Sequence, residues 1–163
     1  MRSIILSITS GLLLSGCAVS VTHTRPTEAT PAVNAVGTEP VYIAASGAAA
    51  SLPFSDAVRV GNILYLSGKI GADPATGQLA PGGIGPETRQ ALENIRGTLE
   101  ANGSSMDRVF KCQVFLADMK EWEAMNAVYA TFFPNHKPAR SAFGATGLAL
   151  NARTEIECAA TVP

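Results

Sequence analysis

Two kinds of charged side chain in the last quarter of the chain could bind and hydrolyse a small acid. Arg140 lies at the entrance of an otherwise apolar run, in Pro-Ala-Arg-Ser. A guanidinium group offers a rigid fork that fits a carboxylate with two hydrogen bonds. Arg140 is therefore either an anion-binding residue or an exposed cation at a strand end. Glu155 and Glu157 would share one face of a strand, which indicates either an acidic site or a solvent-exposed sheet edge.

Familiar catalytic and metal-binding patterns are absent from the sequence. It contains no Cys-x-x-Cys, His-Glu-x-x-His, Walker or Gly-x-Ser-x-Gly motif. His23 falls in a polar segment and His136 in an expected loop, so no histidine pair is placed to bind metal. The 12 basic residues nearly balance the 13 acidic ones and form no stripe, which argues against nucleic-acid binding.

The first 16 residues have the features of a bacterial lipoprotein export signal. A charged start, Met1-Arg2, precedes an uncharged apolar run over residues 3–15 and the ending Leu-Ser-Gly-Cys. The run is too short to span a membrane, which takes roughly 20 apolar residues. The ending resembles a lipobox and implies lipidation of Cys17; the alternative is an ordinary signal peptide with a chance cysteine. By resemblance to the enterobacterial sorting rule, Ala18 rather than Asp after this cysteine favours the outer membrane, with the protein in the periplasm.

The remaining chain divides into a tether and one domain. Residues 17–40 are rich in Thr, Ala, Val and Pro without a persistent period, so we expect a lipid-anchored flexible tether. Residues 41–163, roughly 120 residues, are enough for a single core. Cys112 and Cys158 lie in this domain. In an oxidising compartment they could form a disulfide, or they could be two separate buried thiols.

Alternating sequence periods in the domain predict an α+β fold. Strands are expected at 41–43, 54–60, 63–66, 109–116, 141–145 and 154–162, with Gly61-Asn62 as a hairpin turn. A first helix should run from Pro86 to Asn102-Gly103, and a second from Lys120 to Phe133, where Trp122, Met125 and Tyr129 lie near one face.

The predicted order is β-β-β-α-β-α-β-β, a mixed β-sheet with two helices on one face. The other face of this sheet would have nothing to cover it within one chain. An uncovered apolar sheet face usually marks an oligomer interface. The topology alone therefore indicates self-association.

Several segments, in this order and spacing, resemble the YjgF/Rid family of reactive-intermediate deaminases, also known as the endoribonuclease L-PSP family. The similar segments are Pro53–Val58, Gly61–Gly68, Pro74–Gly77, Thr88–Ile95, Met125–Phe133, Pro138–Ser141 and Glu155–Glu157. The resemblance covers essentially everything after residue 40. It implies a chorismate-mutase-like single domain that forms a homotrimer with ligand clefts between subunits. It also implies hydrolysis of enamines and imines to 2-oxo acids and ammonia, with no metal and no cofactor.

The resemblance also implies roles for individual residues. Arg140 would bind the substrate carboxylate and Glu155 would place the attacking water, so these are the expected catalytic residues. Further substrate-binding positions match Phe54, Ser67, Asn126 and Ala142. Ala142 stands where the archetypal members have Cys, but its backbone carbonyl can still help to hold the water. Phe54 stands where the family often has Tyr, and Lys69 adds a cation that either reaches the cleft or lies on the surface.

The sequence therefore predicts an imine/enamine deaminase outside the cytoplasm, acting on a small imino acid. The alternative is a non-enzymatic lipoprotein that binds small carboxylates in the same cleft. The export signal argues against the usual family substrates, because the pyridoxal-phosphate enzymes that release them are mostly cytoplasmic. A ribonuclease role fits poorly with a net charge of −1 and no basic stripe.

Overall fold

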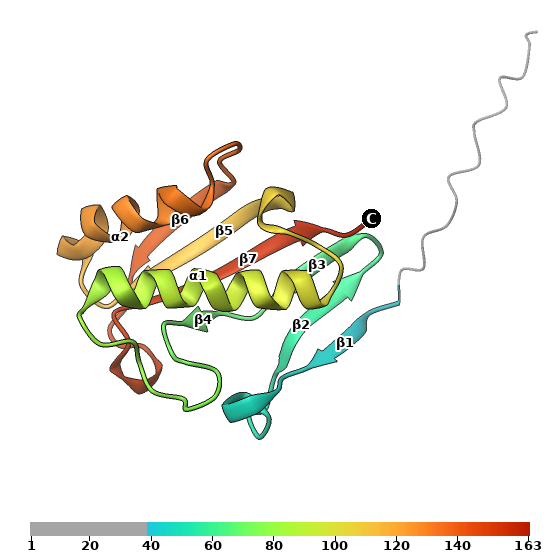
Figure 1. Cartoon of the computed structure of the whole chain (residues 1–163), viewed down its shortest axis with the longest axis horizontal. Helices are drawn as coiled ribbons and strands as arrows, with labels where there is room; N and C mark the ends of the chain where they lie inside the picture. Colours follow the sequence, from blue (N-terminus) through green and yellow to red (C-terminus); the bar gives the residue numbers. More distant parts are fainter. Residues whose placement is uncertain (1–38) are drawn as a thin grey trace, which may run out of the picture. The chain divides into compact units, whose positions relative to one another are not determined.

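The computed structural model describes residues 39–163, which fold into one mixed sheet and two α-helices (Figure 1). The helices are α1 (Ile84–Ala101) and α2 (Trp122–Tyr129). The strands are β1 (Val41–Ala44), β2 (Ser55–Val60), β3 (Ile63–Leu66), β4 (Lys69–Ile70), β5 (Val109–Leu116), β6 (Ala139–Gly144) and β7 (Thr154–Thr161). The expected export signal, Cys17 and the expected tether up to residue 38 lie outside the described residues.

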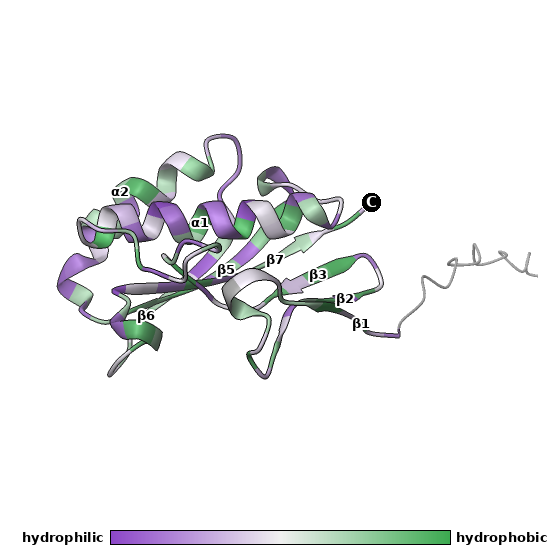
Figure 2. Ribbon diagram, turned by 60° about the horizontal axis from the view of Figure 1, so that its bottom comes forward, coloured by the Kyte–Doolittle hydropathy of each residue, from purple (hydrophilic) through white to green (hydrophobic). Residues whose placement is uncertain are grey.

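The sheet has the order β1-β2-β3-β7-β5-β6, and β4 pairs with β7. Only β5 and β6 are parallel, because α2 connects them as a crossover; the other pairs are antiparallel. Both helices cover the same face of the sheet (Figure 2). This confirms the predicted α+β fold, and β4 is the one strand that the sequence patterns did not predict.

Local sequence signals explain where the hairpin and the helices begin and end. Gly61 has a φ of 59°, which suits the tight turn between β2 and β3. Helix α1 begins at Ile84, two residues before Pro86, and ends where Gly103 adopts a φ of 75°. The predicted second helix is α2 with a 3-10 turn at each end, and Asp118 caps its start by accepting a hydrogen bond from the Lys120 amide.

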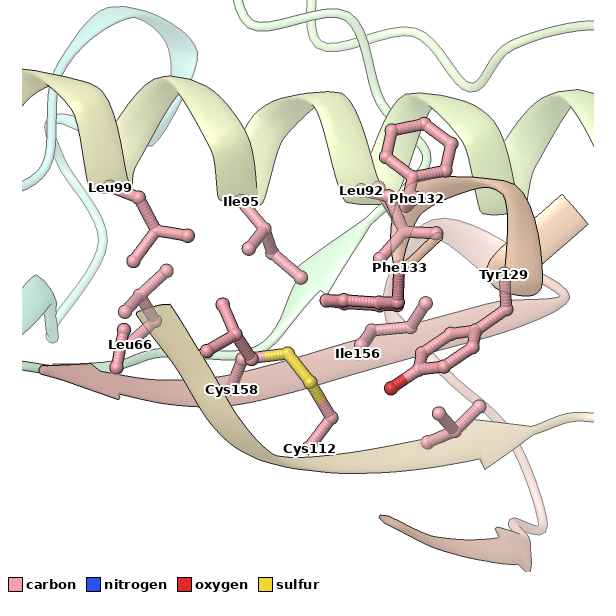
Figure 3. Packing of buried hydrophobic residues seen from close by; sticks show 14 of the residues in the cluster. Leu66, Leu92, Ile95, Leu99, Cys112, Tyr129, Phe132, Phe133, Ile156 and Cys158 are labelled. Carbon is pink, nitrogen blue, oxygen red and sulfur yellow. A yellow bond between two sulfur atoms is a disulfide. The ribbon is translucent and has the colours of Figure 1, made fainter. Parts of the chain in front are cut away.

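The core lies between the helices and the sheet, around a disulfide (Figure 3). Cys112 on β5 lies directly opposite Cys158 on β7, and the two sulfur atoms are bonded. Leu92, Ile95 and Leu99 of α1 are fully buried above this strand pair. The disulfide settles the alternative that the sequence left open. Within residues 39–163, no helix combines the length and apolar character needed to cross a bilayer.

Candidate functional site

Arg140 lies on β6 beneath helix α2. It is in register with Cys112 of β5, and it therefore points to the side of the sheet that the helices cover. Its guanidinium carbon is 4.5 Å from the ring centroid of Tyr129 and 6.0 Å from that of Trp122. Those two aromatic residues are seven positions apart on α2, about two turns, and so share one face of the helix. The β5-α2-β6 crossover is what brings them over Arg140.

A cavity of about 330 Å³ lies beside Arg140, between the end of α2 and the start of β6. Its lining consists of Asn126, Tyr129, Ala130, Phe133, Lys137, Pro138 and Arg140. The Asn126 Oδ1 and Tyr129 hydroxyl oxygen atoms are buried without a hydrogen-bond partner. A small cavity with a cation and an unpartnered amide is suited to an organic acid, because buried polar groups require partners.

The environment of Tyr129 keeps its hydroxyl group neutral. Burial raises the pKa of Tyr129 to about 12, although the positive charge of Arg140 acts in the opposite direction. The ring of Tyr129 also packs against Phe133, with their centroids 4.8 Å apart. Tyr129 is therefore an uncharged and tightly packed neighbour of the guanidinium group.

A second group of the predicted site residues gathers around Glu155 on β7. Gly68 lies against its side chain: a Cβ atom at this glycine would be 2.0 Å from Glu155 Oε1. Ser67, the preceding residue, donates a hydrogen bond from its hydroxyl to the backbone oxygen of Ser55, at 2.7 Å. Phe54 precedes Ser55 in the chain and is half exposed. Ser67 is thus next to the glycine that borders Glu155, and Phe54 is next to the Ser55 carbonyl that Ser67 contacts.

The carboxyl group of Glu155 is shifted toward its protonated form. Burial raises its pKa above the ordinary value, and the nearby Glu157 carboxylate raises it further. Glu157 itself accepts a hydrogen bond from the Gln113 side chain. A glutamate whose pKa is raised in this way is better able to exchange a proton near neutral pH.

The two predicted catalytic residues lie on opposite faces of the sheet. Side chains along a strand point alternately to the two faces of the sheet. Cys158 on β7 points toward the helices, so Glu157, one residue away, and Glu155, three residues away, point to the other face. Arg140 and Ala142 point toward the helices, and Asn126 of α2 lines the cavity beside Arg140. One protomer therefore brings Arg140 and Asn126 together in one cavity. Ala142 is on the same side of the sheet but does not line this cavity, and Glu155 does not reach Arg140.

Lys69 does not belong to either group. Its ammonium pairs with Asp56, whose other oxygen accepts a hydrogen bond from Thr98 of α1 at 2.8 Å. The alternative in which Lys69 reaches a ligand is therefore not supported. Conversely, the sequence missed the contacts of Trp122 and Tyr129 with Arg140. Their seven-residue spacing was a visible signal, but it indicated only a common helix face.

A family model described as Endoribonuclease L-PSP matches residues 44–162. The chain belongs to this family, the YjgF/Rid family. A 2-iminobutanoate/2-iminopropanoate deaminase of Mus musculus is 43% identical over 108 residues, covering 66% of this chain and 80% of the mouse protein. The chloroplastic Reactive Intermediate Deaminase A of Arabidopsis thaliana is 36% identical over 138 residues, covering 84% of this chain and 74% of the Arabidopsis protein.

Solved structures of YjgF/Rid proteins share the fold of the described residues. RidA from an Antarctic Psychrobacter is 33% identical with a TM-score of 0.68, covering 74% of this chain and 98% of that one. The YjgF gene product of E. coli is 31% identical with a TM-score of 0.65, covering 77% of this chain and 96% of the E. coli chain. The arrangement of two helices on a mixed sheet is thus that of the family.

Proposed function

We propose that this YjgF/Rid protein hydrolyses reactive imines and enamines of small acids to 2-oxo acids and ammonia. The observation that carries the proposal is the Arg140 cavity, in which a cation and the Asn126 amide face a volume suited to a small acid. The deaminase names of relatives such as the mouse protein support the same reaction class.

The proposed chemistry needs an oriented substrate and an oriented water molecule. Arg140 binds the substrate carboxylate through its two parallel N–H groups. Water adds to the electrophilic imine carbon, the nitrogen takes up a proton, and the C–N bond then breaks to release ammonia and leave the carbonyl. Glu155 holds the water and passes its proton toward the departing nitrogen. The main-chain carbonyl of Ala142 offers the water a second acceptor.

The complete site is proposed to form between subunits of a homotrimer. Arg140 and Glu155 lie on opposite faces of one sheet, so one cleft can contain both only if they come from different copies. The sheet face without helices carries exposed aromatic residues, with Tyr65 52% exposed and Phe143 48% exposed. Such a face favours burial against another copy of the chain.

The proposed location is the periplasmic side of a membrane, with the outer membrane favoured and an anchor at Cys17. The lipobox-like sequence supports the anchor, and the disulfide supports an oxidising compartment. Metabolic labelling with a radioactive fatty acid tests the anchor. The label should enter the wild-type protein and be lost in Cys17→Ser, and equal labelling of the two would contradict the anchor.

The function is tested by ammonia release from 2-iminopropanoate generated in the assay. The purified protein should accelerate release, and Arg140→Ala should lower kcat/KM by about 10- to 100-fold because a charge-assisted carboxylate contact is lost. Arg140→Lys is the matched variant, since it keeps the charge but removes the two-pronged geometry. Equal rates for wild type and Arg140→Ala would exclude the proposed role of this cavity in hydrolysis.

A non-enzymatic carboxylate-binding role is the second candidate. It is favoured by the presence of the whole Arg140 cavity within one protomer, away from Glu155. In that case pyruvate should raise the melting temperature of the wild type but not of Arg140→Ala. Ammonia release would then be the same with and without the protein.

A further inference from the structure

Arg140 has an unusual environment for a buried or half-buried cation. Within residues 39–163 it forms no ion pair. The guanidinium groups that donate hydrogen bonds there belong to Arg59, Arg96 and Arg153 and not to Arg140. Its near neighbours are instead the ring of Tyr129 at 4.5 Å and that of Trp122 at 6.0 Å. Cation–π attraction extends to about 6 Å from the ring centroid. The Tyr129 contact is well inside this range, and the Trp122 contact is at its outer limit.

We propose that Trp122 and Tyr129 are positioning residues that hold Arg140 ready for a carboxylate without neutralising it. This inference rests on the proposed function of Arg140 as the carboxylate-binding residue. We call the pair the aromatic clamp. It is the α2 side of the binding site, and it acts through Arg140 rather than by touching the reacting atoms.

The physical advantage of the clamp lies in the charge that it leaves free. An aspartate or glutamate partner would orient the guanidinium, but it would also occupy the N–H groups that a substrate carboxylate needs. An aromatic ring attracts the cation through its π face. The N–H groups at the edge of the guanidinium plane then remain available to form two parallel hydrogen bonds.

The buried part of the clamp is itself held in place. Tyr129 is 7% exposed, and its ring packs against Phe133, which is 3% exposed. Trp122, at 40% exposed, forms the outer side. A ring fixed by core packing restricts the guanidinium to fewer orientations, which reduces the entropy lost when a carboxylate binds.

The chain contains a matched control pair outside the site. The guanidinium carbon of Arg96 on α1 lies 4.9 Å from the ring centroid of Phe132, which is 6% exposed. Phe132 does not line the Arg140 cavity. Phe132→Leu therefore removes a cation–π pair and a buried ring of similar size without changing the contacts of Arg140.

The test compares the steady-state kinetics of four variants of the full protein. Tyr129→Leu and Trp122→Leu should each raise KM for 2-iminopropanoate by roughly three- to tenfold with kcat within about twofold. Tyr129→Phe keeps the ring but removes a hydroxyl group from the cavity lining, so its KM should rise less than that of Tyr129→Leu. Phe132→Leu should retain the wild-type KM, and it should lower the melting temperature about as much as Tyr129→Leu. An unchanged KM in both clamp variants, or an equal rise in Phe132→Leu, would overturn the proposal.

Two further measurements separate failure of the clamp from failure of the proposed function. If the wild type releases no ammonia, the dissociation constant of pyruvate replaces KM, with the same expected order of variants. The side-chain Nε–H resonance of Arg140 should carry a ring-current shift that disappears in Tyr129→Leu and persists in Tyr129→Phe. A resonance without that shift in the wild type would disprove the clamp whether or not the protein is an enzyme.

Discussion

Gly68 determines how much space the Glu155 carboxylate has. A Cβ atom at this position would be 2.0 Å from Glu155 Oε1, so Gly68→Ala must displace the end of that side chain. Because the displaced group is flexible, we expect the fold to survive and kcat to fall by roughly tenfold as the water loses its acceptor. Steady-state ammonia release and circular dichroism measure the two effects.

Gly97 provides the matched glycine control for this variant. It is exposed on α1, and a Cβ atom there would meet nothing within 4 Å. Gly97→Ala should stabilise the protein by about 1 kcal/mol through helix propensity and leave kcat unchanged. If Gly68→Ala retained full turnover, the placement of Glu155 by Gly68 would be irrelevant to catalysis.

Glu155 should reduce stability at neutral pH and be required for activity. Its pKa is raised in the folded state, mainly by burial and also by Glu157, so unfolding is favoured once the pH exceeds the value of an unfolded glutamate. Glu155→Gln should therefore unfold at higher urea concentration than the wild type at pH 7. The difference should shrink as the pH falls and disappear well below about 4.3, the pKa of an unfolded glutamate, because the carboxyl group is then protonated in both states.

The same variant should have lost most of its turnover, because an amide cannot accept the proton from water. In the wild type, kcat/KM should fall on the acidic side at a pH above that expected for an ordinary glutamate. A Glu155→Gln protein that is fully active, or one that is less stable than the wild type at pH 7, would contradict this role.

At the residue scale, the sequence predicts which elements carry the candidate site residues, but it does not predict which side chains contact them. The motif spacing placed Arg140 at a strand start and Glu155 on a strand, and both positions are as expected. The pairing of Arg140 with Trp122 and Tyr129 depends on how α2 packs over β6, which no local pattern encodes. The same applies to Lys69, whose partner Asp56 lies on a different strand.

At the scale of elements, the disulfide joins two central strands that flank the site. It connects β5, the neighbour of the Arg140 strand, with β7, which carries Glu155. The two cysteines are 46 residues apart in sequence, and a crosslink over such a loop stabilises the folded state by about 4 kcal/mol in the chain-entropy description. We expect Cys112→Ala/Cys158→Ala to lose roughly this amount in urea unfolding.

Reductant supplies the control for this prediction. Dithiothreitol should destabilise the wild type under unfolding conditions and have no effect on the double variant. If the wild type and the double variant unfolded at the same urea concentration, the disulfide would contribute nothing to stability in solution.

Elements long enough to repeat their hydrophobic pattern several times are predictable from the sequence, and very short elements are not. The fully buried Leu92, Ile95 and Leu99 recur at helical spacing, and α1 was found within a few residues. The strand β4 has two residues, too few for any period, and is defined only by its pairing with β7. Strand β6 begins two residues earlier than predicted because its pairing with β5 already includes Ala139 and Arg140.

At the scale of the whole molecule, the sheet divides the predicted site into two halves. The half with Arg140, Asn126 and Ala142 lies under the helices, and the half with Glu155 faces away from them. Sequence order could not reveal this division, because it depends on which face of the sheet the helices cover. The uncovered face predicted from topology is present, and it carries the exposed ring of Tyr65.

A subunit-complementation experiment tests whether the two halves meet between copies. Arg140→Ala and Glu155→Gln are each expected to be nearly inactive. When they are unfolded together and refolded as a 1:1 mixture, mixed trimers should regain about a quarter of the wild-type activity. Roughly one interface in four then joins an intact Arg140 to an intact Glu155 from the neighbouring copy. Mixing the two folded proteins without subunit exchange is the control and should restore nothing. A refolded mixture as inactive as either variant would mean that both residues act within one protomer, or that they do not share a site.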